Sequence, residues 1–496
     1  MASKPMKLHT SARSSSPSRP RRLRDFLRQK YERIPKTRRH AMLAATCLLW
    51  FAVVGVVAGV ASLRHSPGGP GSNTSTTTTS PSWVGPAGNT SHHMALSIMS
   101  RKQGIMTPAS PSDPGAALEA GIVQKALAAY TSYHGTDPEI QAYIDLSTVS
   151  AARLMADEAA DLARWPLDRL AVGNAMLADT TGDQAVADAL PALRKTVHHN
   201  NVNPDDGDGG GMWYWQEYPG WAYLDGAYGL APFVAADYAR GMAGDDTVTT
   251  SSTGGQGHKA AHTLAQLDLL WAHTRDAATG LLVHGYYYHH EDGITGPEAS
   301  GVVWARGVAL FLMALVDTLE LVWPKWRGGG LEWGRPPPEV MLLRRMSGMY
   351  ASLAMDVLRY VDDESRGWFQ VVDAAGREGN YVESSATAMF AYALLKGARL
   401  GYLGPDPENA VLAVEAGYAA HKMLVERFVS GSGEGEGLLD WAGTVGVCSL
   451  NSTADYEYYV SRPLVPNSAL GAAAFVLASV EVERLGGDAA VGVKLR

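Results

Sequence analysis

Cysteine is nearly absent from this chain, whose 496 residues contain only Cys47 and Cys448. Cys47 falls in an apolar run close to the N-terminus, so Cys448 has no partner in the rest of the sequence. No disulfide can form inside a folded region there, whatever its compartment. We therefore expect the core to be held together by packing alone.

Basic charge is scarce outside the first forty residues. Residues 1–40 contain 13 Lys and Arg against two carboxylates, a net charge of +11, which leaves −19 for residues 41–496. Nucleic-acid binding depends mainly on neutralising phosphates, so we expect none from the larger part of the chain. Metal-ligand spacing is also lacking, because the doublets His198-His199 and His289-His290 point apart on a helix or strand, and we predict neither metal nor cofactor.

One long apolar run defines the N-terminal organisation. Residues 41–63 contain no charged residue, and about 20 apolar residues suffice for a helix to cross a bilayer. The sequence predicts an uncleaved transmembrane signal-anchor helix at 41–63, after a disordered basic tail at 1–40. In this single-pass type II topology the tail is cytoplasmic, and everything after residue 64 lies in the secretory lumen or outside the cell.

Gly, Pro, Ser and Thr dominate residues 64–94, a composition that predicts a stalk. No second linker interrupts residues 95–496, which we interpret as one domain. Asn73, Asn89 and Asn451 begin Asn-X-Ser/Thr triplets and are N-glycosylation acceptors in form, which the luminal topology makes relevant.

Apolar residues recur at helical spacing through most of this domain, whereas strand-like runs are few and short. We expect helices over the ranges 116–130, 140–162, 169–179, 184–197, 224–242, 257–273, 302–322, 338–360, 384–400, 409–429 and 468–483. Such helices between Gly-rich loops fit stacked helical hairpins, either as an open solenoid or as a closed barrel. The loops show no sequence repeat, which favours the closed form.

Tyr and Trp are plentiful, 21 and 13 against 8 Phe, and gather in loops before helices. Rings with a polar handle beside Arg, His and Asp are typical of a carbohydrate groove, although they could also be packing at the wide end of a barrel. The central stretch is 221–233, in which Asp225 stands among aromatic residues before an apolar run. Asp225 could cap a helix, or its apolar wall could favour the protonated carboxyl that a proton donor needs.

Five segments in chain order carry a resemblance to a known family. They are Tyr223–Gly226 with Ala231–Phe233, Gly280–Tyr286, Trp304–Gly307, Gly367–Gly397, and Gly443–Val445 with Tyr456–Val460. The chain resembles the unsaturated glucuronyl and rhamnogalacturonyl hydrolases, glycoside hydrolase families 88 and 105, and more closely family 105. The resemblance implies an all-α fold, an (α/α)6 barrel of six helical hairpins, here preceded by the one transmembrane helix.

The resemblance also implies a chemistry that needs no metal. Such an enzyme releases an unsaturated uronic acid from the non-reducing end of lyase-generated oligosaccharides of the pectin or rhamnogalacturonan type, by hydrating the C4=C5 double bond. Asp225 matches the general acid and base. Asp168, in a Leu-Asp segment, resembles the assisting carboxylate, although helix capping explains it nearly as well.

Other residues match positions that line the sugar site, namely His284, Trp304 and Arg306. Arg306 is suited to the uronate carboxylate, because guanidinium offers two parallel donors; the alternative is a surface ion pair. The aromatic loops add further expected substrate contacts, Tyr214, Trp221 and Tyr223.

Several positions depart from the family pattern. Tyr287 replaces an Asp, Ala309-Leu310 replaces Gly-Trp, and Tyr214 and Tyr223 stand where His and Trp are usual. A changed pocket could mean a changed substrate or lost catalysis. The alternative to a hydrolase is therefore a catalytically degenerate glycan-binding or cell-wall scaffold protein on the same barrel.

Overall fold

The structure, a computed structural model, describes residues 89–156, 164–199, 202, 210–241, 255–289, 296–326 and 338–486. The predicted tail, the predicted span at 41–63 and Asn73 lie outside these residues. Among the helices that are described, none combines the length and the apolar character needed to cross a membrane.

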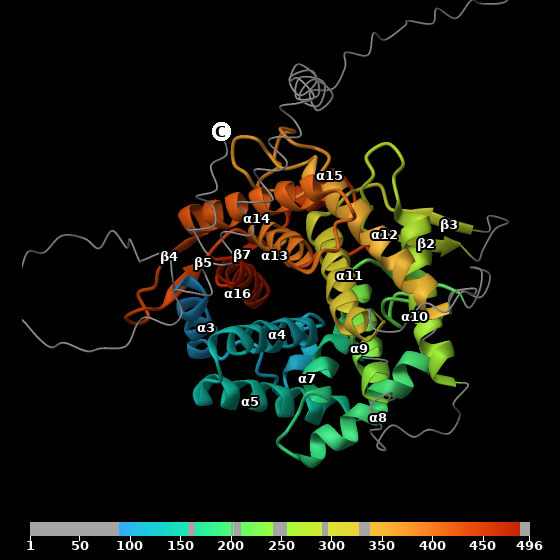
Figure 1. Cartoon of the computed structure of the whole chain (residues 1–496), viewed down its shortest axis with the longest axis vertical. Coiled ribbons are helices and arrows are strands. Elements are labelled where there is room, and N and C mark those ends of the chain that lie inside the picture. The colour runs from blue at the N-terminus through green and yellow to red at the C-terminus, as the bar shows by residue number, and fades with distance from the viewer. Residues whose placement is uncertain are drawn as a thin grey trace, which may run out of the picture. The chain divides into compact units, whose positions relative to one another are not determined.

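Six helical elements form a closed inner ring in the described part of the chain (Figure 1). They are α4 (Ala116–His134), η2 (Leu167–Val172) continued by α7 (Gly173–Leu177), α9 (Gly226–Gly241), α11 (Ala305–Trp326), α13 (Ser384–Leu400) and α16 (Ala469–Arg484). Each packs against the next, and α16 packs back against α4. The ring is therefore a barrel and not an open solenoid, as the sequence predicted.

A second set of helices packs on the outside of this ring. They are α3 (Thr90–Ser100), α5 (Pro138–Met155), α8 (Gln184–His199), α10 (Gly255–Thr274), α12 (Pro338–Leu358) and α14 (Pro407–Phe428). Inner and outer helices alternate along the chain, so each outer helix returns the chain and all inner helices start at the same end.

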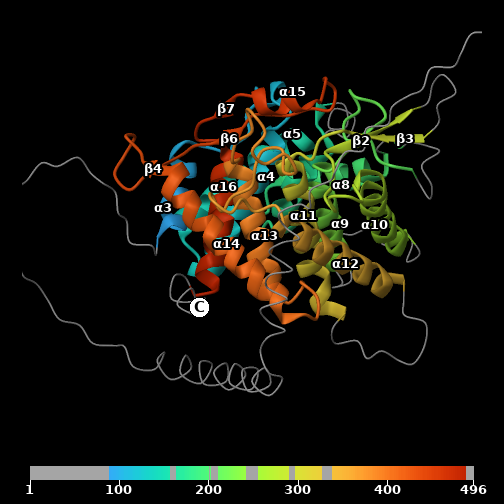
Figure 2. The ribbon, with the colours of Figure 1, turned by 90° about the horizontal axis from the view of Figure 1, so that it is seen from above.

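Short strands and one short helix gather at the end where the inner helices begin (Figure 2). The elements are β1 (Trp221–Tyr223), β2 (Gly285–His289), β3 (Gly296–Ala299), β4 (Val429–Gly431), β5 (Leu439–Trp441), β6 (Thr444–Val445), β7 (Leu464–Val465), α15 (Tyr456–Ser461) and, elsewhere, the 3-10 turn η1 (Ser110–Ser112). The strands pair antiparallel in the orders β1-β2-β3, β4-β5 and β6-β7.

Local sequence explains where the helices begin and why the inner ones are buried. Asp137 caps α5 by accepting from the N–H groups of Glu139 and Ile140, with Pro138 in the first turn. From Ser384 to Gly397 every residue of α13 is buried, which requires a helix that is apolar or small on all sides. The inner helices are therefore buried on both sides, toward the outer helices and toward the axis of the barrel.

The predicted helices are confirmed in existence and order, although several of their boundaries differ and α3 was not predicted. The segment predicted at 169–179 starts as a 3-10 helix, and the helix predicted at 140–162 ends at Met155, with 157–163 outside the described residues. The stalk predicted to reach residue 94 is wrong at its end, because α3 starts at Thr90. Its polar start masked the pattern of Met94, Ala95 and Ile98, which are fully buried.

Candidate active site

Carboxyl groups collect at the end of the ring where the inner helices start. Asp225 directly precedes α9, Glu383 caps α13, and Glu119 lies in the first turn of α4. Asp168 lies in the first turn of η2, which begins another of the inner elements. Helix N-termini favour negative charge, so six converging N-termini are a suitable place for acids.

Strand pairing brings Asp225 and His284 together. Tyr223 of β1 pairs with Gly285 of β2, and the Leu224 N–H donates to the His284 carbonyl oxygen at 3.0 Å. The His284 Nε2 atom then lies 3.2 Å from the Asp225 Oδ2 atom. Among the described residues, the Asp225 carboxyl group bonds to His284 and not to an N–H group of the first turn of α9. The N-cap interpretation of Asp225 is therefore not supported.

His284 is held on its other side by Tyr459, whose hydroxyl lies 2.7 Å from Nδ1. Burial raises the pKa of Tyr459, so its hydroxyl keeps its proton and we assign it as the donor to Nδ1. The tautomer assigned by this bond carries its hydrogen on Nε2 and donates to Asp225. Since His284 is fully buried, it positions the acid and does not line the sugar site as predicted.

Two glycines allow the close approach of these groups. A Cβ at Gly285 would collide with the Ala222 carbonyl oxygen. At Gly307, one turn into α11, it would lie 3.5 Å from the Asp225 Oδ2 atom and 3.2 Å from the His284 ring. A side chain at Gly307 would thus be tight against the His284 ring and in ordinary contact with the Asp225 carboxyl.

Asp168 is the second carboxyl of the site and is 2% exposed. Its Oδ2 atom accepts from the Tyr214 hydroxyl at 2.8 Å, while Oδ1 has no partner among the described residues. The Tyr214 ring stacks on Tyr223 at 4.3 Å between centroids, and Tyr223 stands two residues before Asp225. The tyrosine pair thus links the two carboxyl-bearing segments.

Burial raises the pKa of Asp168 to about 7, the Tyr214 hydrogen bond opposes the shift, and the negative charge of Asp225 adds to it. Because the charge of Asp225 raises the pKa of Asp168, the two carboxyl groups lie close enough to interact electrostatically. A carboxyl that titrates near neutrality exchanges protons readily, which a helix cap does not need. Asp168 stands inside η2, whose N-cap is Pro166 without a side-chain cap bond, so the capping interpretation of Asp168 is not supported.

Sequence reasoning missed Glu119, the third carboxyl at this end. Burial raises the pKa of Glu119 to about 7, Asp113 adds to the shift, and the nearby Arg306 opposes it. No motif marked this residue, which looks like an ordinary first-turn acid of α4. Only the closure of the ring brings it into reach of Arg306.

Arg306 is buried, so the surface-ion-pair alternative is wrong. Its Nη1 and Nη2 atoms donate to the carbonyl oxygens of Val445 and Gly446, at 2.6 and 2.5 Å. Glu383 holds the same loop by accepting from the Val445 N–H at 2.9 Å. Arg306 and Glu383 thus fix a loop at the site, and uronate binding by Arg306 stays a prediction that rests on its remaining N–H groups.

The aromatic residues divide into wall and surface. Trp304 is 2% exposed and packs against the His284 ring at 4.4 Å, so it is a wall and not the stacking platform that the sequence predicted. Trp221 and Tyr287 are half-buried and pack together at 4.9 Å. Open ring surface for a sugar lies on these two and on Tyr214.

The departures from the family pattern have different consequences. Tyr214 supplies a donor to Asp168, and Tyr223 accepts from the N–H groups of Leu450 and Asn451, so both take part in the site. Ala309 and Leu310 are wholly buried in α11 and do not reach it. Within the described residues, no three His, Cys, Asp or Glu side chains are grouped to hold a metal ion.

Fold and site together define the class: a helical-barrel glycoside hydrolase with paired carboxyl groups at the start of its inner helices. The sequence comparison gives the family. Residues 90–486 match the sequence profile of Glycosyl Hydrolase Family 88, and the chain belongs to that family.

Curated relatives and solved structures agree with this. Protein Atu3128 of Agrobacterium fabrum is 33% identical over 224 residues, which cover 44% of this chain and 88% of the relative. A family 105 glycoside hydrolase of C. acetobutylicum aligns with a TM-score of 0.61 and 24% identity over 80% of this chain and 99% of its own. An unsaturated glucuronyl hydrolase of Bacillus sp. GL1 aligns with a TM-score of 0.53 and 16% identity over 80% and 96%.

Proposed function

We propose that the chain releases an unsaturated uronic acid from the non-reducing end of lyase-generated oligosaccharides of the pectin or rhamnogalacturonan type. The observation that carries the proposal is the chain of hydrogen bonds from Tyr459 through His284 to Asp225, beside the neutral-range carboxyl of Asp168. The Bacillus neighbour is described as responsible for the degradation of glycosaminoglycan, a use of the same fold on uronate-bearing chains.

In the proposed reaction the Asp225 carboxyl gives its proton to C4 of the double bond. The carboxylate that results takes a proton from the water that adds at C5, so Asp225 returns to its starting state. The C5 hemiketal then opens to a ketone, and the bond to the leaving sugar breaks. His284 orients Asp225 through Nε2, and Asp168 supplies or accepts a proton at its side of the site.

Trp221, Tyr214 and Tyr287 offer their ring faces to the sugar in this proposal, since they keep exposed surface. In this proposal Arg306 binds the uronate carboxylate through the N–H groups that its bonds to the Val445 and Gly446 carbonyl oxygens do not use. We assign the substrate carboxylate to the N-terminal end of the inner helices, where backbone N–H groups compensate negative charge.

Incubation of the purified full chain with lyase-generated pectin fragments tests the proposal, because hydration removes the absorbance of the conjugated double bond. We expect loss of absorbance with the parent chain and about a thousandfold slower loss with Asp225→Asn. No loss with unsaturated galacturonides or glucuronides, where a family 105 enzyme works, would overturn it. Binding of an intact oligosaccharide that Asp225→Asn leaves unchanged would establish the glycan-binding alternative instead.

The location of the enzyme is part of the proposal. We infer a type II anchor at 41–63, with the domain in the secretory lumen or outside the cell, from the charge-free run and the basic tail before it. Asn89 and Asn451 are exposed, as glycan acceptors must be. In sealed microsomes we expect the domain to resist added protease and to shift in mass with endoglycosidase; digestion without detergent would contradict the topology.

A further inference from the structure

A cavity of about 900 Å³ occupies the end of the ring opposite to Asp225. Every inner element contributes to its wall, and many of its charged residues stand in later helical turns, such as Lys396 and Arg399 of α13 or Glu481 and Arg484 of α16. This volume suits a ligand of mono- or disaccharide size. None of the carboxyl groups of the candidate active site lines it.

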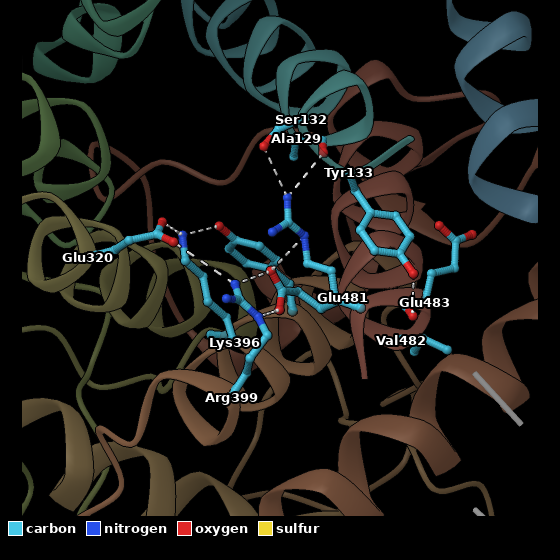
Figure 3. A network of polar contacts seen from close by, with 12 residues as sticks. Ala129, Ser132, Tyr133, Glu320, Lys396, Arg399, Glu481, Val482 and Glu483 are labelled. Atoms are coloured by element: carbon cyan, nitrogen blue, oxygen red, sulfur yellow. Dashed lines mark hydrogen bonds and ion pairs between the residues drawn. The ribbon is translucent and has the colours of Figure 1, made fainter. Parts of the chain in front are cut away.

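Alternating charges run across the wall of this cavity (Figure 3). Lys125 and Lys396 share the Asp317 carboxylate, and Lys396 also lies 2.6 Å from Glu320. Arg399 binds Glu481 through two bonds of 2.6 and 2.8 Å, and Figure 3 shows Lys396 and Arg399 beside Glu320 and Glu481. The order of charges is Lys125, Asp317, Lys396, Glu320, Arg399, Glu481, Arg484.

Both ends of this series are basic residues, so four basic groups face three carboxylates. Burial lowers the pKa of Lys125 and of Lys396, and a bound anion would favour the charged form of Lys125. Lys125 keeps 27% of its side chain exposed. Arg484 reaches Ser132 and Ala129 only at 3.4 and 3.5 Å, beyond the usual hydrogen-bond length, and Glu481 only at 4.0 Å. Both end groups therefore have donors to give.

The remaining charged residues of the lining are Asp145, Asp179 and Arg240. Gln141 donates to Asp145 and Thr181 donates to Asp179, so both carboxylates have partners outside the series. The lining as a whole is balanced, and the positive excess is local to the series that ends at Lys125 and Arg484.

Tyr228 adds a neutral donor beside Lys125. The residue is 3% exposed and lines the cavity, yet its hydroxyl has no hydrogen-bond partner among the described residues. The Lys125 Nζ atom lies 5.2 Å from the centre of its ring. The hydroxyl oxygen does not belong to the fully buried atoms that lack a partner, so it is open to the cavity, where a ligand or water can bond to it.

We propose that this cavity is a second ligand site, for a sugar-sized organic acid such as a uronic acid, with Lys125 and the Tyr228 hydroxyl binding its carboxylate. Converging helix C-termini repel anions, so the cations are what makes an anion acceptable there. Tyr228 stands one turn after Asp225 on α9, and Ala171 of the lining stands one turn after Asp168. An occupant therefore touches the two segments that carry the active-site carboxyls.

Calorimetric titration of the full chain with sodium D-galacturonate tests the site without any turnover. D-Galactose is the matched ligand, because it lacks only the carboxylate charge. We expect galacturonate to bind and galactose not to bind. Tyr228→Phe should weaken binding by roughly 2- to 12-fold and Lys125→Met by roughly 10- to 150-fold, the range for neutral and charged hydrogen bonds.

Lys125→Met removes a partner of buried Asp317 and could impair folding, whereas Tyr228→Phe removes only an unpartnered hydroxyl. Trp221→Ala serves as the control at the opposite end and should leave this affinity unchanged. Equal binding of galactose, unchanged affinity in Tyr228→Phe and Lys125→Met, or loss of binding in Trp221→Ala alone would each overturn the proposal. Because no product is measured, its failure is separate from failure of the proposed hydrolase activity.

Discussion

Carboxyl groups at the two ends of the barrel have opposite kinds of partner. Where the inner helices begin, Asp225 contacts the His284 imidazole and Asp168 contacts the Tyr214 hydroxyl. Where these helices end, Asp317 is shared by two ammonium groups. A neutral donor lets a carboxyl gain or lose a proton, whereas a cation keeps it ionised. The same residue type thus serves proton transfer at one end, in the function that we propose, and forms ion pairs at the other.

The largest expected effect concerns Asp225, at the end where the inner helices begin. Asp225→Asn keeps the shape of the side chain but cannot donate or accept the proton, and kcat should fall by roughly a thousandfold with little change in KM. The absorbance assay measures it. The control is Asp268→Asn, in an exposed pair with Arg345, which should keep the parent rate. More than a tenth of the parent kcat in Asp225→Asn would exclude Asp225 as the acid.

Removal of the fixed charge at the other end should cost stability instead. Asp317→Ala leaves Lys125 and Lys396 without their shared carboxylate, and the free energy of unfolding should fall by about 3–5 kcal/mol. Asp268→Ala, which breaks the exposed pair, should cost at most about 1 kcal/mol. Urea unfolding of both variants measures the contrast, and equal losses would contradict it.

Asp168 connects protonation with stability. Its folded-state pKa of about 7 exceeds the ordinary 3.8, so the folded state binds the extra proton between these values. Stability from this group is complete below about pH 4 and is lost as pH rises to about 7. Asp168→Asn keeps the acceptor for Tyr214 without this loss.

Relative to the parent, the free energy of unfolding of Asp168→Asn should therefore increase as pH rises, by at most roughly 4 kcal/mol at pH 8. Denaturant titrations of both proteins at pH 5 and pH 8 measure this difference. A gap that stays constant with pH would mean that Asp168 is ionised throughout.

The smallest effect concerns Tyr459, which acts through His284. Tyr459→Phe removes the donor to Nδ1 and should lower kcat by roughly 2- to 12-fold, with a shifted pH–rate profile. Tyr456→Phe removes a hydroxyl of the same short helix that donates to the Glu378 carbonyl oxygen, and should leave the profile unchanged. If both variants gave the same pH–rate profile, Tyr459 would contribute packing only.

The helices and their order could be predicted because a buried face has a period that the sequence displays. The closure of the ring was favoured only indirectly, by the lack of a loop repeat. Asp225 and Asp168 were found through motifs, whereas Glu119 was missed because a first-turn acid on α4 has no local signal. Long-range contacts decide such positions.

Burial was the property least accessible from the sequence. Trp304, His284 and Arg306 were expected to face the sugar, and all three are nearly or fully buried. Aromatic and polar residues in one loop look alike whether they line a groove or support it. Their roles followed only from partners that lie far away in the chain, such as Tyr459 for His284 and Val445 for Arg306.

The contact between α4 and α16 joins the first and the last helix of the inner ring. During synthesis the ring cannot close until residue 484 has left the ribosome, long after Asp168 has been made. Premature termination anywhere before α16 therefore leaves an open arc with exposed apolar faces, a species that quality control can recognise.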